Sequence, residues 1–365
     1  MPDTLSSLAK KYNGFVAPGY SIIINNTDLS GKFLIEDLRI ELTSGYESSG
    51  LAFKVKNGFE NGANYTAKLN KEFAGLIKPG SIAEASIGYG AGRTKIFHGY
   101  VDNVYMEYNG ANEFDISVEC LDAKGIMMNS RRSEVKKDVK KYSEAVRSIF
   151  DSYPKLITKQ SVDKSPEVRM VEQYNESDYD FIVRISKKIN YRFYILNGEA
   201  VFSPSKSQAT LFKIMKSDLL KSFTLHTSLK RHVSEVIVRS GNEEEPSKPF
   251  SGKATEYKSA VDGSNISIES PSVMPKKTVQ TYIDHSVSSE EEAKSVAEAH
   301  MSRLSNDWAT GKLECIGIPE LVPGKVIEIE GFGEPYDRTY YVNKAMHVIG
   351  EEGYVTQCEL GVDAP

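Results

Sequence analysis

The side chains that most often carry enzyme chemistry form no recognisable constellation in this sequence. The six histidines show no HExxH or similar ligand spacing, and the three cysteines form no CxxC pair that would suit zinc. No GxSxG motif is present, and no cysteine has the flanking pattern of a nucleophile. We therefore predict no catalytic, cofactor-binding or metal-binding residues, no cofactor and no enzymatic activity.

The glycine cluster Gly88-Tyr89-Gly90-Ala91-Gly92 is the one stretch that might suggest a phosphate-binding loop. It lacks the spacing of either nucleotide fingerprint, and no helical pattern follows it. A hairpin turn explains it better. Carboxylates are plentiful, so a glycosidase pair stays open as an alternative, but no feature singles out two acids with different environments.

Composition describes an ordinary globular chain that favours strands. The 365 residues suffice for two or three domains, and the 20 Tyr and 15 Phe far outnumber the single Trp. The net charge of −5 argues against specific nucleic-acid binding, which needs a positive surface. Three sparse cysteines indicate a reducing cytoplasm, and we expect no signal peptide and no membrane insertion, because no long apolar run occurs.

Hydrophobic periodicity divides the chain into four parts. We expect an N-terminal arm over 1–18 and a first β-barrel domain over 19–128, which strands from 216–240 could complete. An α/β insertion domain should occupy 129–215, with a helix capped by Ser177. The second β-barrel domain should occupy 216–365, with a long loop at 240–275 and a helix at 289–305. The predicted fold class is mainly β with an α+β insertion.

An internal repeat supports two similar tube-like β-barrel domains plus a small α/β domain. Residues 79–122 and 323–363 both begin with Pro-Gly, reach a Gly-aromatic-Gly turn, and place Arg-Thr before a long strand. Both then turn at a glycine-containing loop and end in an alternating strand that carries a cysteine, Cys120 or Cys358. We interpret them as two copies of one β-meander. Three such chains in a ring would present six similar units around one axis.

A family resemblance rests on three segments. Residues 176–185 (ESDYDFIVRI), followed by Tyr191–Tyr194, resemble the phage late control gene D proteins and the VgrG-like baseplate hub proteins. Residues 97–101 (FHGYV) resemble the first-barrel strand of this family, and residues 341–356 resemble its last hairpin. The resemblance covers about residues 20–360 in order, and implies the hub part only.

What the resemblance implies is a structural baseplate hub of a contractile phage tail or tailocin. The partners would be two further copies in a homotrimer, a tail tube or tube-initiator protein, a central spike protein and other baseplate subunits. The particle would be assembled in the bacterial cytoplasm and released by lysis as part of a virion tail or tail-like particle. A tail-associated peptidoglycan hydrolase remains the alternative function.

Two hairpins, near 105–114 and 347–354, are the expected contacts with the tube or with neighbouring protomers. Contact between protomers would come from barrel edge strands, because unpaired edges readily add strands from a neighbour. The candidate contact residues are Tyr105, Tyr108, Asn109, Asn112, His347, Glu351, Glu352 and Tyr354.

Overall fold

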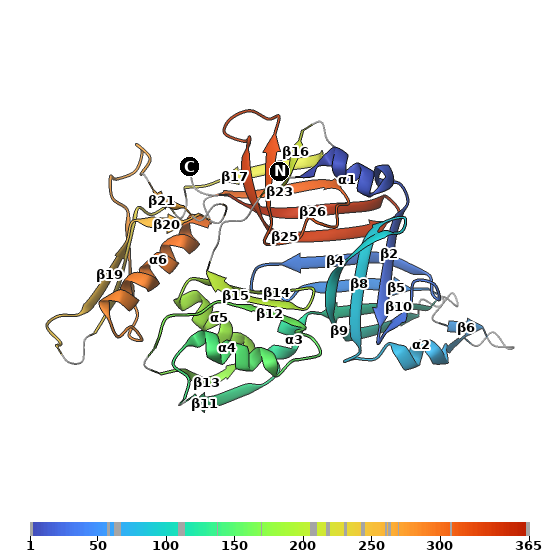
Figure 1. Ribbon diagram of the computed structural model, residues 1–365, viewed down its shortest axis with the longest axis horizontal. Coiled ribbons are helices and arrows are strands. Elements are labelled where there is room, and N and C mark those ends of the chain that lie inside the picture. The colour runs from blue at the N-terminus through green and yellow to red at the C-terminus, as the bar shows by residue number, and fades with distance from the viewer. Residues whose placement is uncertain are drawn as a thin grey trace.

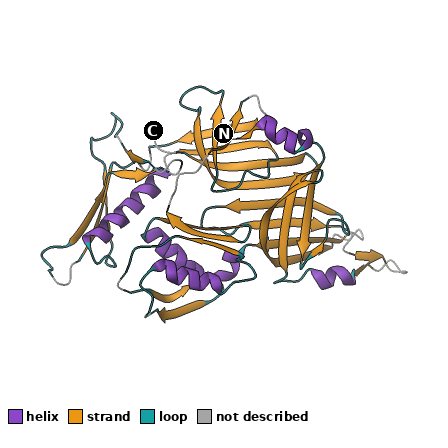
Figure 2. Cartoon of the chain, viewed as in Figure 1, coloured by secondary structure: helices purple, strands orange, loops and turns teal. Residues whose placement is uncertain are grey.

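The computed structural model describes most of the chain, and its largest feature is one sheet of 14 strands (Figure 1). The described residues are 3–56, 59–61, 67–108, 114–136, 138–168, 170–204, 210–216, 220–229, 232–241, 245–259, 261, 264–268, 270–306 and 309–362. The chain is mainly β, as predicted; its longer helices lie in two regions beside the sheet, and two short helices lie elsewhere (Figure 2). None of the described helices is long and apolar enough to cross a membrane.

The large sheet contains two six-stranded units, and the two remaining strands of the 14 are short strands at its ends. The first sheet unit has the order β4-β5-β10-β9-β8-β2 and the second has the order β17-β23-β26-β25-β24-β16. The first contains β2 Pro18–Ile24, β4 Ile35–Thr43, β5 Gly50–Val55, β8 Ile82–Tyr89, β9 Gly92–Tyr108 and β10 Phe114–Leu121. The second contains β16 Thr210–Met215, β17 Leu220–Thr227, β23 Ala309–Ile316, β24 Val326–Glu330, β25 Arg338–Gly350 and β26 Gly353–Gly361.

The two stretches of the sequence repeat fold as matching antiparallel meanders, β8-β9-β10 and β24-β25-β26. The Gly80 N–H donates to the carbonyl of Val101, and the Gly324 N–H donates to that of Val342, at 2.8 and 2.9 Å. Both glycines have φ near +85°, which only glycine adopts without strain. One residue later in each long strand, a β-bulge shifts the register. The repeat is therefore a structural duplication.

The register also corrects one detail of the repeat. If Val101 is matched to Val342, Val118 corresponds to Cys358 and Cys120 to Leu360. The two cysteines therefore lie two residues apart in the duplicated strand, on the same buried face. The last strand of each unit departs further: β2 runs antiparallel to β8, whereas β16 runs parallel to β24.

Neither unit is the closed barrel that the sequence suggested. Within the described part of the chain, no ladder joins β2 to β4 or β16 to β17. The second edge of β4 pairs with β25 instead, so this edge joins the two units and does not close the first one. The two ends of the first unit still approach, because the Tyr20 hydroxyl donates to the carbonyl of Ile35 at 3.1 Å. Strands from 216–240 do not complete the first unit either, since β17 pairs with β23.

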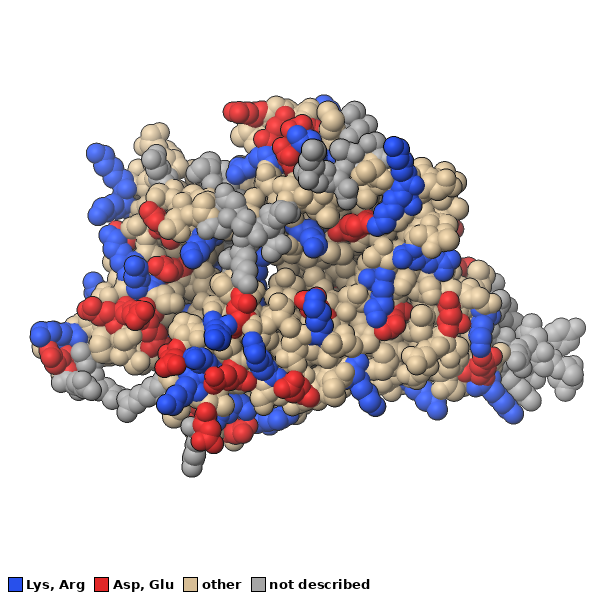
Figure 3. Space-filling view, viewed as in Figure 1, with Lys and Arg blue, Asp and Glu red and all other residues tan. Residues whose placement is uncertain are grey.

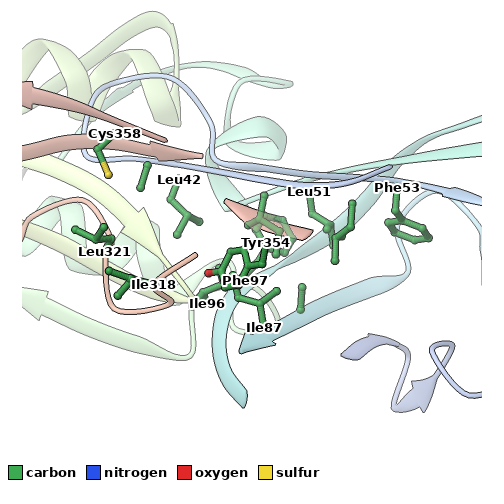
Figure 4. Packing of buried hydrophobic residues seen from close by; sticks show 14 of the residues in the cluster. Leu42, Leu51, Phe53, Ile87, Ile96, Phe97, Ile318, Leu321, Tyr354 and Cys358 are labelled. Carbon is green, nitrogen blue, oxygen red and sulfur yellow. The ribbon is translucent and has the colours of Figure 1, made fainter. Parts of the chain in front are cut away.

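One hydrophobic core runs through both sheet units. Leu42, Leu51 and Ile87 come from the first unit, and Tyr354 and Cys358 come from the second, within the same cluster (Figure 4). Inward-facing residues alternate with outward-facing ones along the strands, as the period of two requires. A single shared core explains why the two units do not behave as separate domains.

The N-terminal arm covers one end of this core. It contains β1 Asp3–Thr4, which pairs with β16, α1 Leu5–Lys11 and the 3-10 turn η1 Asn13–Phe15. Tyr12 and Phe15 are buried against Tyr89 of the first unit, with ring centroids 5.6 and 5.4 Å away. Tyr89 in turn lies 5.5 Å from Tyr354 of the second unit. Arm and units are therefore held by one aromatic cluster.

The insertion domain has a core of its own. Its helices are α3 Ala123–Met127, α4 Tyr142–Asp151 and α5 Asp178–Lys188, and its strands are β11 Arg131–Val135, β12 Lys159–Val162, β13 Glu172–Ser177, β14 Tyr191–Leu196 and β15 Glu199–Pro204. The helix predicted to start at Ser177 does so, with a capping box formed by Ser177 and Asp180. The α/β unit extends to 204, because β16 belongs to the large sheet.

A third core lies where the sequence suggested a long loop. The α6 unit contains β18 Glu235–Ser240, β19 Phe250–Ala254, β20 Glu256–Lys258, β21 Asn265–Ser267, β22 Val279–Ile283 and α6 Glu290–Asn306. The helix expected at 289–305 is α6. This unit is inserted between β17 and β23, where the matching strands β4 and β5 have only a short turn. The remaining elements are β3 Thr27–Asp28, which pairs with β2, the hairpin of β6 Phe59–Asn61 and β7 Ala67–Leu69, and α2 Lys71–Leu76, which buries Phe73 in the main core.

Helix α6 packs directly on β19 at Gly252, and this contact generates a prediction. A Cβ atom at Gly252 would lie 2.1 Å from the backbone of Ala293 and Lys294. Gly252→Ala should therefore destabilise the protein by about 1–3 kcal/mol through overpacking, measured by urea unfolding. Gly241→Ala is the matched control, because nothing lies within 4 Å of a Cβ there. Equal stability of the two variants would contradict this packing.

A buried histidine predicts how stability depends on pH. His347 is 1% exposed, and burial lowers its pKa to about 3. An unfolded histidine has a pKa of about 6.5, so the unfolded state binds more protons between these values. The free energy of unfolding should therefore fall by about 2 kcal/mol from pH 8 to pH 5 through this residue alone. His347→Gln should reduce that pH dependence in denaturant titrations, whereas His285→Gln, at an exposed position, should leave it unchanged.

Candidate assembly surface

The first predicted hairpin is formed by β9 and β10, and its outer half projects beyond the neighbouring strand. β8 pairs with β9 only as far as Tyr100, so on that side no described strand pairs with 102–108. Tyr105 and Tyr108 are exposed there, as expected of contact residues. Asn109 and Asn112, the other two predicted residues of this hairpin, lie outside the described residues.

The second predicted hairpin is formed by β25 and β26. Glu351 and Glu352 are exposed at its turn, which Gly353 closes with a φ of +87°. His347 and Tyr354, in contrast, are buried in the core, and the Tyr354 hydroxyl lies 2.8 Å from Nδ1 of His347. Their side chains therefore serve the fold of the protomer, and the two glutamates are the accessible groups of this hairpin.

The buried pair belongs to the ladder between β4 and β25, which we call the joint. The two strands run antiparallel, with Ile40 opposite His347 and Leu38 opposite Ile349. Along β4, the side chains of Leu38, Ile40 and Leu42 all point into the core. The other face is polar, and Lys344 forms an ion pair with Glu41 at 2.6 Å that raises the pKa of Lys344. The joint is therefore apolar on one face and charged on the other.

The duplication shows what lies at the equivalent place in the other unit. Aligning the β-bulges of the two long strands matches residue 102 of β9 with residue 343 of β25. The joint residues of β25 therefore have counterparts in β9: Ala345 corresponds to Val104, His347 to Met106 and Ile349 to Tyr108. The three β9 residues are 36%, 63% and 56% exposed, although their counterparts face the core. Apolar side chains along a strand edge that has no described partner strand are unusual, because such edges invite pairing with another strand.

A second free edge lies on β17, which corresponds to β4. β17 pairs with β23 as β4 pairs with β5, and its other edge has no partner among the described strands. Matching the ladders places Leu225 at the position of Ile40 and Phe223 near that of Leu38. Both side chains are half-buried against the main core. The protomer thus contains one complete joint, between β4 and β25, and it also carries the two equivalent strand edges, on β17 and β9, which do not pair with each other.

Val104 and Met106 on β9 and Phe223 and Leu225 on β17 were not among the contact residues predicted from the sequence. The alternation of Val104, Met106 and Tyr108 was visible in the sequence, but it is the same signal that a buried strand gives. Only the pairing pattern shows that this stretch of β9 lacks a neighbour on one side.

The described residues offer little to enzyme chemistry. No group of three or more His, Cys, Asp or Glu residues among them could hold a metal ion. All three cysteines are buried, and burial raises the pKa of the Cys315 thiol to about 12 and raises that of Cys120 and Cys358 as well. A thiol that stays protonated is a poor nucleophile. Figure 3 shows acidic and basic side chains interspersed over one face of the molecule, without a broad basic stripe.

Comparison with solved structures identifies the fold. The 43 kDa tail protein of prophage MuSo2 from Shewanella oneidensis aligns with a TM-score of 0.69 and 12% identity, over 94% of this chain and 98% of that one. The tail protein from Neisseria meningitidis MC58 aligns with a TM-score of 0.70 and 9% identity, over 95% and 97%. The resemblance to phage tail proteins is confirmed over nearly the whole chain, at the level of fold.

The VgrG-like part of the resemblance is also confirmed as a fold. The E. coli c3393 protein is described as a type VI secretion component with structural similarity to the T4 tail proteins gp27 and gp5. It aligns with a TM-score of 0.57 and 11% identity, over 94% of this chain and 79% of that one. No curated protein sequence matches the chain. A family model described as the Alg8 N-terminal domain matches residues 59–351, so the chain belongs to the Alg8 N-terminal domain family.

Proposed function

We propose that the chain is a structural baseplate hub that forms a homotrimeric ring of six similar sheet units. Such a ring would adapt a sixfold tail tube to a threefold central spike. The observation that carries the proposal is the joint. The protein contains one contact between unlike edges, β4 with β25, and among the described strands the equivalent edges of β17 and β9 have no partner. The tail proteins with the same fold support this assignment.

The joint defines a specific contact between protomers. In the ring, β17 of one chain would pair antiparallel with β9 of the next, as β4 pairs with β25 within a chain. Transferring the register of the joint places Leu225 opposite Met106 and Phe223 opposite Tyr108. The exposed apolar side chains of β9 would then face the core, as their counterparts in β25 do. Two different edges that meet head to tail build a ring when the rotation closes.

Tube-like walls would arise in the same way. Each unit is open in the single chain, and its free edges would be covered by neighbouring units in the ring. We therefore propose two tube-like β-barrel domains whose walls are completed by neighbouring units in the ring. The domain division that we propose is an arm at 1–18, a first sheet unit at 19–128, the insertion to 204, and a second sheet unit with the α6 unit.

We assign the remaining predicted contact residues to contacts between the ring and other proteins of the tail. Glu351 and Glu352 at one turn, and Tyr105 with Asn109 and Asn112 at the other, are the proposed contacts with a tube or tube-initiator protein. A central spike and other baseplate subunits would complete the partners. The chain would act without enzymatic activity, assembled in the bacterial cytoplasm into a virion tail or tail-like particle that is released by lysis.

A cysteine pair tests the register of the contact. Met106→Cys combined with Leu225→Cys should form disulfides between chains under mild oxidation, because directly opposite residues have Cβ atoms about 4.5–5.5 Å apart. A trimer band on a non-reducing gel is the expected result. The matched control is Tyr105→Cys with Leu225→Cys, which places the two thiols on opposite faces of the sheet. Equal cross-linking of both pairs, or of neither, would rule out this register.

A charge at the same edge tests the assembly itself. Met106→Asp should weaken self-association by about 100-fold, because the carboxylate would be buried without a partner. Mass in solution, measured by light scattering over a range of concentrations, should shift from trimer to monomer. Met170→Asp is the control, at a methionine of similar exposure on the insertion. A wild-type protein that stays monomeric at high concentration, even with the spike present, would contradict the proposal.

A further inference from the structure

The joint has a charged face as well as an apolar one, and that face holds one cation between two acids. Lys344 forms an ion pair with Glu41 at 2.6 Å across the two strands. The hydrogen bond to Glu41, and to a smaller extent the charge of Glu359, raise the pKa of Lys344. The polar side of the joint therefore adds an electrostatic contact to the apolar one.

The duplication places different side chains at these positions of the ring contact, by which we mean the proposed pairing of β17 with β9 of the next chain. The correspondences are Glu41 with His226 of β17, Lys344 with Asn103 of β9, and Glu359 with Glu119 of β10. The lysine is replaced by an amide, one acid is kept, and the other acid becomes a histidine. Histidine is the side chain that gains a positive charge between pH 8 and pH 5.

His226 is exposed, and the described residues beside it in its own chain include no acid. Thr310 of β23 is directly opposite, and Lys312 is opposite the residue two positions before His226. Beyond Thr310, β26 contributes Gly361. The His226 side chain forms no hydrogen bond or ion pair within the described part of the chain. A positive charge on His226 is therefore without an acidic partner in the single protomer.

The neighbouring chain would present acids to His226 in the ring contact. In the transferred register Tyr105 lies directly opposite, and Asn103 and Glu107 are the diagonal neighbours, about 7–8 Å away, which long side chains can span. Glu119 accepts a hydrogen bond from the Asn103 amide at 3.3 Å, and its charge raises the pKa of Tyr105. Glu107 and Glu119 are exposed and form no ion pair with described residues.

The other charges near the ring contact strengthen this complementarity. The further charged groups are Asp102, Asp115 and Lys56 on the side of β9 and Lys312 on the side of β17. Asp115 and Lys56 form an ion pair at 2.7 Å, whereas the charge of Asp102 adds to that of Glu119 at Tyr105. One side of the contact is therefore acidic, and the other carries Lys312 and a histidine. Opposite potentials on two surfaces favour their association.

We propose that protonated His226 pairs with Glu107 and Glu119 of the neighbouring chain, and that formation of the ring is therefore coupled to proton uptake. This inference rests on the proposed ring and on its register. Because the acids favour the charged imidazolium, the assembled state binds more protons than the separate chains, and association strengthens as the pH falls from 8 to 6. Exposed ion pairs contribute little, so we expect association about threefold tighter at each contact.

The test measures self-association of the full chain at pH 8 and pH 6, at constant ionic strength so that screening is unchanged. Sedimentation over a series of concentrations gives the equilibrium between monomer and trimer. The wild type should associate more tightly at pH 6. His226→Gln should associate equally at both values, because glutamine does not titrate in this range. His226→Lys should associate tightly at both, because lysine stays charged.

Matched variants identify the acids and control for other histidines. Glu107→Gln and Glu119→Gln should each reduce the difference between the two pH values, and the double variant should abolish it. His285→Gln changes another exposed histidine, in the α6 unit, and should keep the wild-type difference. Circular dichroism at both pH values checks that each variant is folded, because the buried His347 lowers stability on the acid side.

The outcomes separate this inference from the proposed ring. Trimers that form equally well at pH 8 and pH 6 would overturn the coupling and leave the ring intact. A pH dependence that persists unchanged in His226→Gln would do the same. A protein that stays monomeric at both pH values would overturn both the coupling and the ring.

Discussion

The ladder between β4 and β25 is the contact on which the architecture depends. It gives the second edge of β4 to the other sheet unit, so the first unit stays open and the two units share one core. A strand edge must be paired, covered or charged if the protein is to stay soluble. No equivalent contact joins the described strands of the second unit, so the edge of β17 and the outer half of β9 have no described partner strand.

The sequence alone predicted features that depend on neighbouring residues, but it did not predict the pairing of strands that lie far apart in the chain. The alternation of 114–121, the capping signal at Ser177 and the glycines at 80 and 324 all act within a few residues, and all predict the structure correctly. The partner of β4 could not be predicted in this way, because pairing of Ile40 with His347 joins residues far apart in the chain. Helix α6 was predicted, but the small strands of its unit were not, because strands as short as β20 and β21 leave no periodic signal.

In the candidate assembly surface, too, the local features could be predicted and the long-range ones could not. The exposure of Tyr105, Tyr108, Glu351 and Glu352 could be predicted because they lie near turns, and turns have strong local signatures. The burial of His347 and Tyr354 depends on β4 and on the N-terminal arm, neither of which is near them in sequence. Conversely, Met106 resembles a core residue in its pattern, and its exposure becomes visible only when the neighbouring strand is known to end.

The two units match along the joint and differ elsewhere, and this difference has a geometric consequence. The α6 unit interrupts the second unit between β17 and β23, whereas the first unit has a short turn at that position, and the insertion follows only the first meander. In a ring of three chains the paired strands would repeat six times, while the insertion and the α6 unit would each repeat three times. A ring built in this way would present near-sixfold symmetry along its wall and threefold symmetry through its added units, which is the combination that a tube and a spike require.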